Sequence, residues 1–141
     1  LKPKAVMLEN VSGLRSTANG KFVEAIKSGI EANGKYQVSY KLLFAPDYGV
    51  PQKRERLVFV GLSKSIGMKF DFDKVKKTHG PGTRKNYTNI KEAIGDLPSL
   101  GSGEERFSYD KDPISEYQIL MRGKNSKLNN HKAPNHPKDY S

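Results

Sequence analysis

The stretch YQVSYKLLFAPDYGVPQKRERLVFVG, residues 36–61, decides the fold. Residues 36–44 are rich in aromatic and aliphatic side chains that favour β-strands, and residues 57–61 form a second run of that kind. Proline and glycine punctuate the connection at residues 45–51. We therefore expect two strands that pair antiparallel.

Two further elements precede this pair. The apolar run at residues 5–8 predicts a strand buried on both faces, as in a parallel sheet covered by helices. Residues 21–33 carry apolar side chains at helical spacing, and Gly34 follows where a glycine commonly ends a helix. The order strand, helix, strand, strand predicts an α/β fold.

The pattern loosens after about residue 66. A helix is predicted at residues 89–97, because Asn89 can cap it and Glu92 has the capping-box spacing. A second short helix is predicted at residues 112–121. Polar, basic sequence follows from residue 122, and we assign no structure to it. The C-terminal half is thus expected to be rich in loops.

Composition narrows the possible chemistry. The 141 residues carry a formal charge of +10 and contain no cysteine. A disulfide scaffold, a cysteine-based metal site and a thiolate nucleophile carried by this chain are therefore excluded. The first 70 residues hold 31 of the 49 hydrophobic residues and a net charge of +7. A basic face that binds a polyanion and a merely soluble basic surface both fit this distribution.

The N-terminal residues and the length of the apolar runs indicate where in the cell the protein is expected. No run approaches the roughly 20 apolar residues of a membrane span. The first residues lack the apolar core of a signal peptide, so we expect a cytosolic protein without a membrane partner. The chain also enters an apolar strand without a start methionine, which suggests an excised piece.

Glu9 is the first candidate for chemistry. It closes the apolar run, so we expect it at the carboxyl edge of a sheet strand, where ligands bind in open α/β sheets. A carboxyl there loses hydration and, when protonated, could donate to a heteroatom of a substrate. The alternative is a structural carboxylate that accepts hydrogen bonds from loop amides.

Arg54 and Arg56 are the second candidates. If the strand already runs at Arg54, period-two alternation places both arginines in line with Val58 and Val60. Guanidiniums so placed are costly unless they meet a carboxylate, a phosphate or a base edge. They either face a ligand or are satisfied internally, with Glu9 as a possible partner.

The three histidines, at positions 79, 131 and 136, lack the spacing of a metal site, so no metal is expected.

These segments together resemble the DNA (cytosine-5)-methyltransferases. PKAVMLENVSGL, residues 3–14, is similar to the family's Glu-Asn-Val motif on its strand. DYGVPQKRERLVFVG, residues 47–61, is similar to its Gln-x-Arg-x-Arg motif. NIKEAIGDLP, residues 89–98, and Asn130-His131 resemble the sequence that leads toward target recognition.

The resemblance implies an enzyme that flips a cytosine out of duplex DNA and methylates its carbon 5 with S-adenosylmethionine. Glu9 would hold the amino edge and ring nitrogen 3 of the cytosine. Arg54 and Arg56 would lie around the flipped nucleotide and its phosphate, with Arg56 nearer the base. Asn10, Val11 and Gln52 would support this pocket.

The resemblance also implies a partial methyltransferase fold. The family's glycine-rich donor motif and its Pro-Cys nucleophile lie upstream of the Glu-Asn-Val strand. We therefore expect a Rossmann-like sheet fragment in which residues 1–67 are the C-terminal portion of the catalytic domain. Residues 68–141 would be a linker and the start of target recognition. No cofactor-binding residue is assigned, and the isolated chain is expected to be inactive.

Three hypotheses follow. The chain is a fragment of a bacterial methyltransferase, with duplex DNA and a companion restriction endonuclease as partners and a location in the cytoplasm at the nucleoid. It is one half of a split methyltransferase completed by another subunit. Or it is a non-catalytic basic module that binds nucleic acid.

Overall fold

The computed structural model describes residues 2–125 and 127–136 and divides the chain into two compact units, Leu1–Tyr87 and Thr88–Ser141. The first unit extends past the boundary expected after residue 67. Its last segment packs on the preceding strands: Ser39 Oγ donates to the carbonyl of Phe70 at 2.5 Å, and Lys41 Nζ lies 2.6 Å from Asp73 Oδ1. The functional division at residue 67 stays a prediction.

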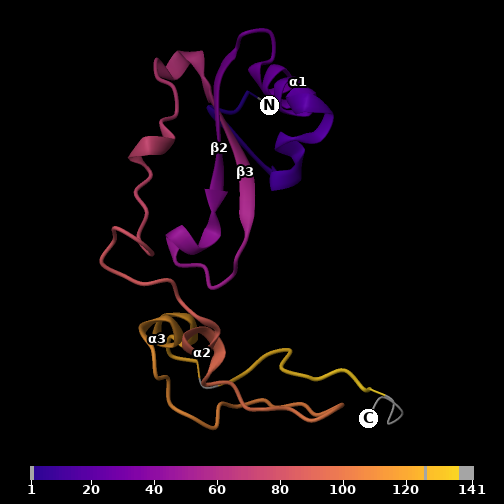
Figure 1. Cartoon of the computed structure of the whole chain (residues 1–141), viewed down its shortest axis with the longest axis vertical. Coiled ribbons are helices and arrows are strands. Elements are labelled where there is room, and N and C mark those ends of the chain that lie inside the picture. The colour runs from indigo at the N-terminus through magenta and orange to yellow at the C-terminus, as the bar shows by residue number, and fades with distance from the viewer. Residues whose placement is uncertain (1, 126, 137–141) are drawn as a thin grey trace. The chain divides into compact units, whose positions relative to one another are not determined.

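The first unit is built on a three-stranded sheet. Its strands are β1 (Ala5–Val11), β2 (Tyr36–Phe44) and β3 (Glu55–Ser63), in the order β1-β3-β2. Both pairs are antiparallel. The predicted α/β class and the antiparallel pairing of β2 with β3 are confirmed (Figure 1).

β1 corrects one expectation. It is not buried on both faces in a parallel arrangement but is an edge strand antiparallel to β3, with alternating exposure. Leu8 packs on the core, whereas Met7 is 75% exposed. In the described residues a helix covers only one face of β1, so only every second side chain is covered.

The core lies between the sheet and helix α1 (Lys21–Glu31). Val23 of the helix packs with Val38, Leu57 and Phe59 of the strands. The predicted helix is confirmed over most of its length, and it ends at Glu31 because the next residues adopt positive φ angles. The sheet and helix thus form a stable platform for the β2–β3 connection.

Short 3₁₀ helices fill the connections. In the first unit they are Ser12–Arg15, Thr17–Gly20, Ala45–Tyr48, Lys64–Ile66 and Phe72–Lys74. The one at Ala45–Tyr48 begins the β2–β3 connection and ends at Gly49, whose φ of +86° closes the turn. Residues 79–82 form a turn.

The second unit contains α2 (Ile90–Ile94) and α3 (Glu116–Arg122). The predicted capping box of Asn89 and Glu92 at α2 is present. α3 begins four residues later than the predicted residue 112, because Ser115 caps it by accepting a hydrogen bond from the backbone N–H of Gln118. Outside these helices the described part of the unit is mostly loops, as expected. Helices long and apolar enough to cross a membrane do not occur among the described residues.

Candidate functional site

Pairing of β1 with β3 brings two candidate residues together. The register sets Glu9 opposite Val58 and Val11 opposite Arg56, so Glu9 and Arg56 lie diagonally on one face of the sheet. Nε of Arg56 contacts Oε1 of Glu9 in an ion pair. The Glu9 side chain is 50% exposed and that of Arg56 is 23% exposed.

The guanidinium of Arg56 has two partners within the first unit. It contacts the carboxylate of Glu9, and its Nη1 also donates to the carbonyl of Glu55 at 2.8 Å. The contact predicted as an alternative, an ion pair of Arg56 with Glu9, is therefore present, and a ligand-facing role of Arg56 stays a prediction. Glu9 lies within β1 rather than at its end, and half of its side chain faces solvent.

Arg54 lies just outside the strand. β3 begins at Glu55, so the predicted shared face holds for Arg56, Val58 and Val60 but does not extend to Arg54. The carbonyl of Arg54 accepts a hydrogen bond from the N–H of Ala45 at 2.8 Å, which closes the base of the β2–β3 connection. The Arg54 backbone is thus fixed beside the first residue of the strand.

The residues predicted to support the pocket, Asn10, Val11 and Gln52, lie near Arg56. Gln52, Arg54 and Arg56 line one open hollow together with Ser12. Asn10 accepts a hydrogen bond from the N–H of Val11 through its Oδ1 at 2.8 Å, which holds the end of β1. The structure therefore brings the six sequence-predicted residues to neighbouring positions at one end of the sheet. Arg56 is paired with Glu9, and the further cations Lys53 and Arg54 make this hollow suited to an anionic ligand.

Asp47 is a structural residue of the same motif that sequence reasoning missed. It is only 6% exposed, and its carboxylate lies 2.7 Å from Nζ of Lys77 and accepts a hydrogen bond from Tyr87 at 2.8 Å. The Lys77 ammonium, and then the Tyr87 hydroxyl, lower the pKa of Asp47 against the opposing effect of burial. An aspartate after proline in a turn gives no signal of partners 30 and 40 residues away.

Two glycines show how closely this region is packed. A Cβ on Gly49 would lie 2.7 Å from the ring of His79, and a Cβ on Gly80 would collide with the ring of Tyr87. His79 Nδ1 is 2.9 Å from Thr78 Oγ1. Clusters of three or more possible metal ligands are absent from residues 2–125 and 127–136.

The methyl donor that the family resemblance implies does not fit the hollow beside α1. That hollow is lined by Arg15, Lys21 and Lys41 against the single carboxylate of Glu24. Lys41 is paired with Asp73, but Arg15 and Lys21 would repel the sulfonium and ammonium groups of S-adenosylmethionine. We assign no residue of this chain to the donor.

Comparison with known proteins covers nearly the whole chain. The sequence profile of C-5 cytosine-specific DNA methylases matches residues 1–139. The type II methyltransferase M.DdeI of Desulfomicrobium norvegicum is 34% identical over 138 residues, which are 95% of this chain and 32% of that protein. M.XorII of Xanthomonas oryzae is 36% identical over 133 residues, 88% of this chain and 28% of that protein.

A further relative is M.AquIA of Picosynechococcus, 38% identical over 68% of this chain and 44% of its own length. The chain thus spans less than half the length of these relatives. A crystal structure described as a DNA modification methyltransferase encoded within an E. coli prophage matches 85% of this chain with a TM-score of 0.63 at 21% identity. That likeness covers 35% of the solved chain and confirms the partial methyltransferase fold.

Proposed function

Because this chain belongs to the C-5 cytosine-specific DNA methylase family, we propose that it forms one wall of the cytosine pocket of a DNA (cytosine-5)-methyltransferase. The whole enzyme would transfer a methyl group from S-adenosylmethionine to carbon 5 of a cytosine flipped out of duplex DNA. The observation that carries this proposal is the contact of Glu9 with Arg56, which joins the family's two motifs.

Glu9 would bind the flipped cytosine. Its carboxyl group can accept a hydrogen bond from the amino group of the base and share a proton with ring nitrogen 3. When a thiolate adds to carbon 6, negative charge develops on the ring, and a proton held at nitrogen 3 offsets it. The half-exposed position of Glu9 leaves its carboxylate accessible to a base.

Arg56 would orient Glu9 and face the base, while Arg54 would contact the phosphate of the flipped nucleotide. The ion pair supports the first role, because it fixes the carboxylate from the neighbouring strand. The position of Arg54 in the open hollow with Gln52 supports the second. Asn10 and Val11 would hold the end of β1 behind Glu9.

The nucleophile must come from elsewhere, since these 141 residues contain no cysteine. We propose that the isolated chain transfers no methyl group and that the thiolate is supplied by further residues of the same protein or by a complementing subunit. A companion restriction endonuclease and a cytoplasmic, nucleoid-associated location fit the type II relatives and belong to this proposal.

The test is a chimera in which this chain replaces the matching segment of M.DdeI, with transfer of labelled methyl groups to duplex DNA as the readout. The chimera should be active, and Glu9→Gln and Arg56→Ala should each reduce its rate, whereas the isolated 141-residue chain should be inactive. Methyl transfer by the isolated chain would disprove the proposal that the thiolate is supplied from outside these 141 residues. Mixing this chain with a separate cysteine-bearing segment would further test the split-enzyme arrangement.

A further inference from the structure

Residues 74–87, which we call the basic loop, concentrate positive charge in the first unit. They contain no aspartate or glutamate. Their five cationic side chains are all exposed: Lys74, Lys76, Lys77, Arg84 and Lys85. Asp47 neutralises Lys77. Lys74, Lys76 and Arg84 therefore keep the loop positively charged after this ion pair is counted.

The conformation of the basic loop is fixed by its own hydrogen bonds. The N–H of Gly80 donates to the carbonyl of Lys85 at 2.7 Å. The hydroxyl of Thr83 lies 2.8 Å from the carbonyl of Gly80 and 2.9 Å from that of Lys85. These contacts fix the turn before any ligand binds, which lowers the entropic cost of binding.

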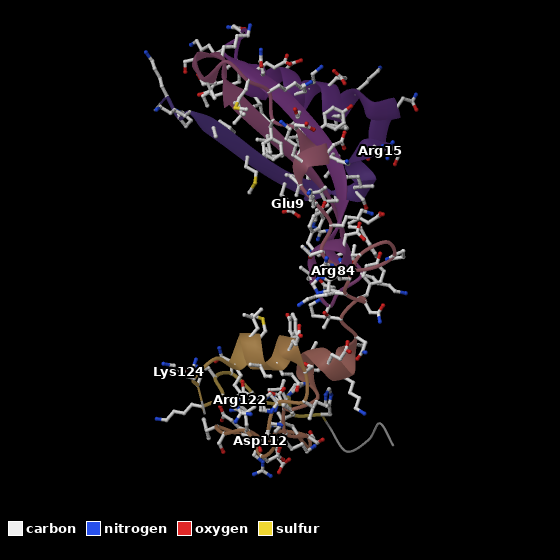
Figure 2. The ribbon with its side chains drawn as sticks, turned by 90° about the vertical axis from the view of Figure 1, so that its left-hand side faces the viewer. Glu9, Arg15, Arg84, Asp112, Arg122 and Lys124 are labelled. Atoms are coloured by element: carbon white, nitrogen blue, oxygen red, sulfur yellow. The ribbon has the colours of Figure 1, made fainter. Side chains whose placement is uncertain are left out.

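The basic loop is also attached to the β2–β3 connection. Tyr87 donates to the Asp47 carboxylate, and the N–H groups of Thr78 and His79 donate to the Asp47 carbonyl at 2.9 and 3.1 Å. Asp47 begins the motif that continues to Arg54. Figure 2 labels Arg84 of this loop and Glu9 of β1, both in the first unit. The loop and the proposed cytosine-pocket residues thus belong to one compact unit.

The chemistry of the loop indicates which ligand it fits. Residues 77–79 and 82–85 line an open hollow with lysine, arginine, threonine and histidine side chains. Ammonium and guanidinium groups bind phosphate oxygens, and such contacts carry no base sequence information. We propose that the basic loop binds the phosphate backbone of duplex DNA. The choice of DNA rests on the proposed function.

The experiment measures affinity of the 141-residue chain for a fluorescent duplex made only of A·T pairs, over a series of salt concentrations. The variant is Lys76→Ala with Arg84→Ala, two exposed cations of the loop. If each contacts a phosphate, the slope of log K against log salt should fall by about 1.8, and affinity at about 0.1 M salt should weaken roughly eightfold per cation.

The matched control is Lys2→Ala with Lys4→Ala, which removes the same charge from exposed positions outside the loop. The control should keep the wild-type slope to within about 0.3. Equal losses in both variants would overturn the proposal, because net charge alone would then explain binding. A wild-type chain that does not bind at about 50 mM salt, or a loop variant affected only on duplex RNA, would also overturn it.

This test is separate from that of the proposed function. The A·T duplex contains no cytosine, so the result does not depend on Glu9 or on methyl transfer. Circular dichroism melting of both variants should match that of the wild type, because every substituted side chain is exposed. If the chimera failed to methylate DNA, the affinity measurements on the basic loop would still be valid. If the loop variant bound DNA as tightly as the wild type, the methyl-transfer test would be unaffected.

Discussion

Arg56 on β3 contacts the carboxylate of Glu9 on the neighbouring β1, so each partner of this ion pair comes from a different motif of the sequence. The antiparallel register produces this contact, because a diagonal pair on one sheet face lies within reach of a long side chain. A shift of one residue would send Arg56 to the opposite face, toward α1. The β1–β3 register is thus required for this ion pair.

Replacing Glu9 by glutamine tests whether this pair acts in catalysis. In the M.DdeI chimera, Glu9→Gln should reduce the methyl-transfer rate by about 10²- to 10³-fold, because proton sharing with the cytosine is lost. Stability should change by less than about 1 kcal/mol, because the Glu9 side chain is half exposed and solvent-accessible ion pairs contribute little. Single-turnover kinetics and urea unfolding measure the two effects.

The control for this substitution is Glu24→Gln. Glu24 also pairs with a cation, Lys27 at 3.6 Å, but on the surface of α1. This variant should keep the full methyl-transfer rate. Equal rates for Glu9→Gln and Glu24→Gln would contradict a catalytic role for Glu9.

Asp47→Asn should destabilise the first unit. The substitution removes the charge by which the buried Asp47 carboxylate pairs with the exposed Lys77 ammonium, and a hydrogen bond to a charged group contributes about 1.5–3 kcal/mol, with the lower end expected because Lys77 is exposed. Urea unfolding should show this loss. Asp73→Asn removes the ion pair with Lys41, in which both side chains are exposed, and should have a much smaller effect. A larger effect at Asp73 than at Asp47 would contradict the anchoring role of Asp47.

The contribution of Asp47 should depend on pH in a defined direction. Lys77 lowers the folded pKa of Asp47, so its stabilisation is present above about pH 4 and is lost as pH falls through the lower folded value. Asp47 raises the pKa values of Lys77 and Tyr87. The stabilisation that these two groups contribute is therefore present below about pH 10 and is lost as pH rises further. The stability difference between wild type and Asp47→Asn, followed by urea unfolding across pH, should therefore narrow at both extremes.

Local patterns predicted the strands, α1 and the α2 cap because each depends on neighbouring residues. The extent of exposure of β1 could not be predicted in this way, because it depends on which elements cover each face of the sheet. The role of Asp47 also depends on residues distant in sequence, since its partners are Lys77 and Tyr87, and local patterns could not predict it. The meeting of Glu9 with Arg56 was raised only as an alternative, since a sequence pattern does not fix strand register.

Gly80→Ala tests the packing of the basic loop on Tyr87. A Cβ at Gly80 would collide with the Tyr87 ring, and the φ of +90° already disfavours alanine. We expect a loss of about 2–4 kcal/mol from the clash and the backbone strain together. Gly82→Ala is the matched control, because its φ is +79° but its Cβ would meet nothing within 4 Å. Similar melting temperatures for the two variants would argue against tight Gly80–Tyr87 packing.

Gln118 should hold α2 and α3 of the second unit together by polar contacts. It is 1% exposed, its Nε2 donates to the carbonyl of Lys91 at 2.9 Å, and its Oε1 accepts from the N–H of Ile114 at 2.6 Å. Gln118→Leu would leave both backbone groups without these partners, so we expect a loss of about 2–4 kcal/mol.

Hydrogen exchange can locate this effect. Protection of amides in residues 88–136 should fall in Gln118→Leu, while protection in β2 and β3 should stay unchanged because they belong to the other compact unit. A leucine variant as protected as the wild type would show that α2 and α3 are held together by other contacts.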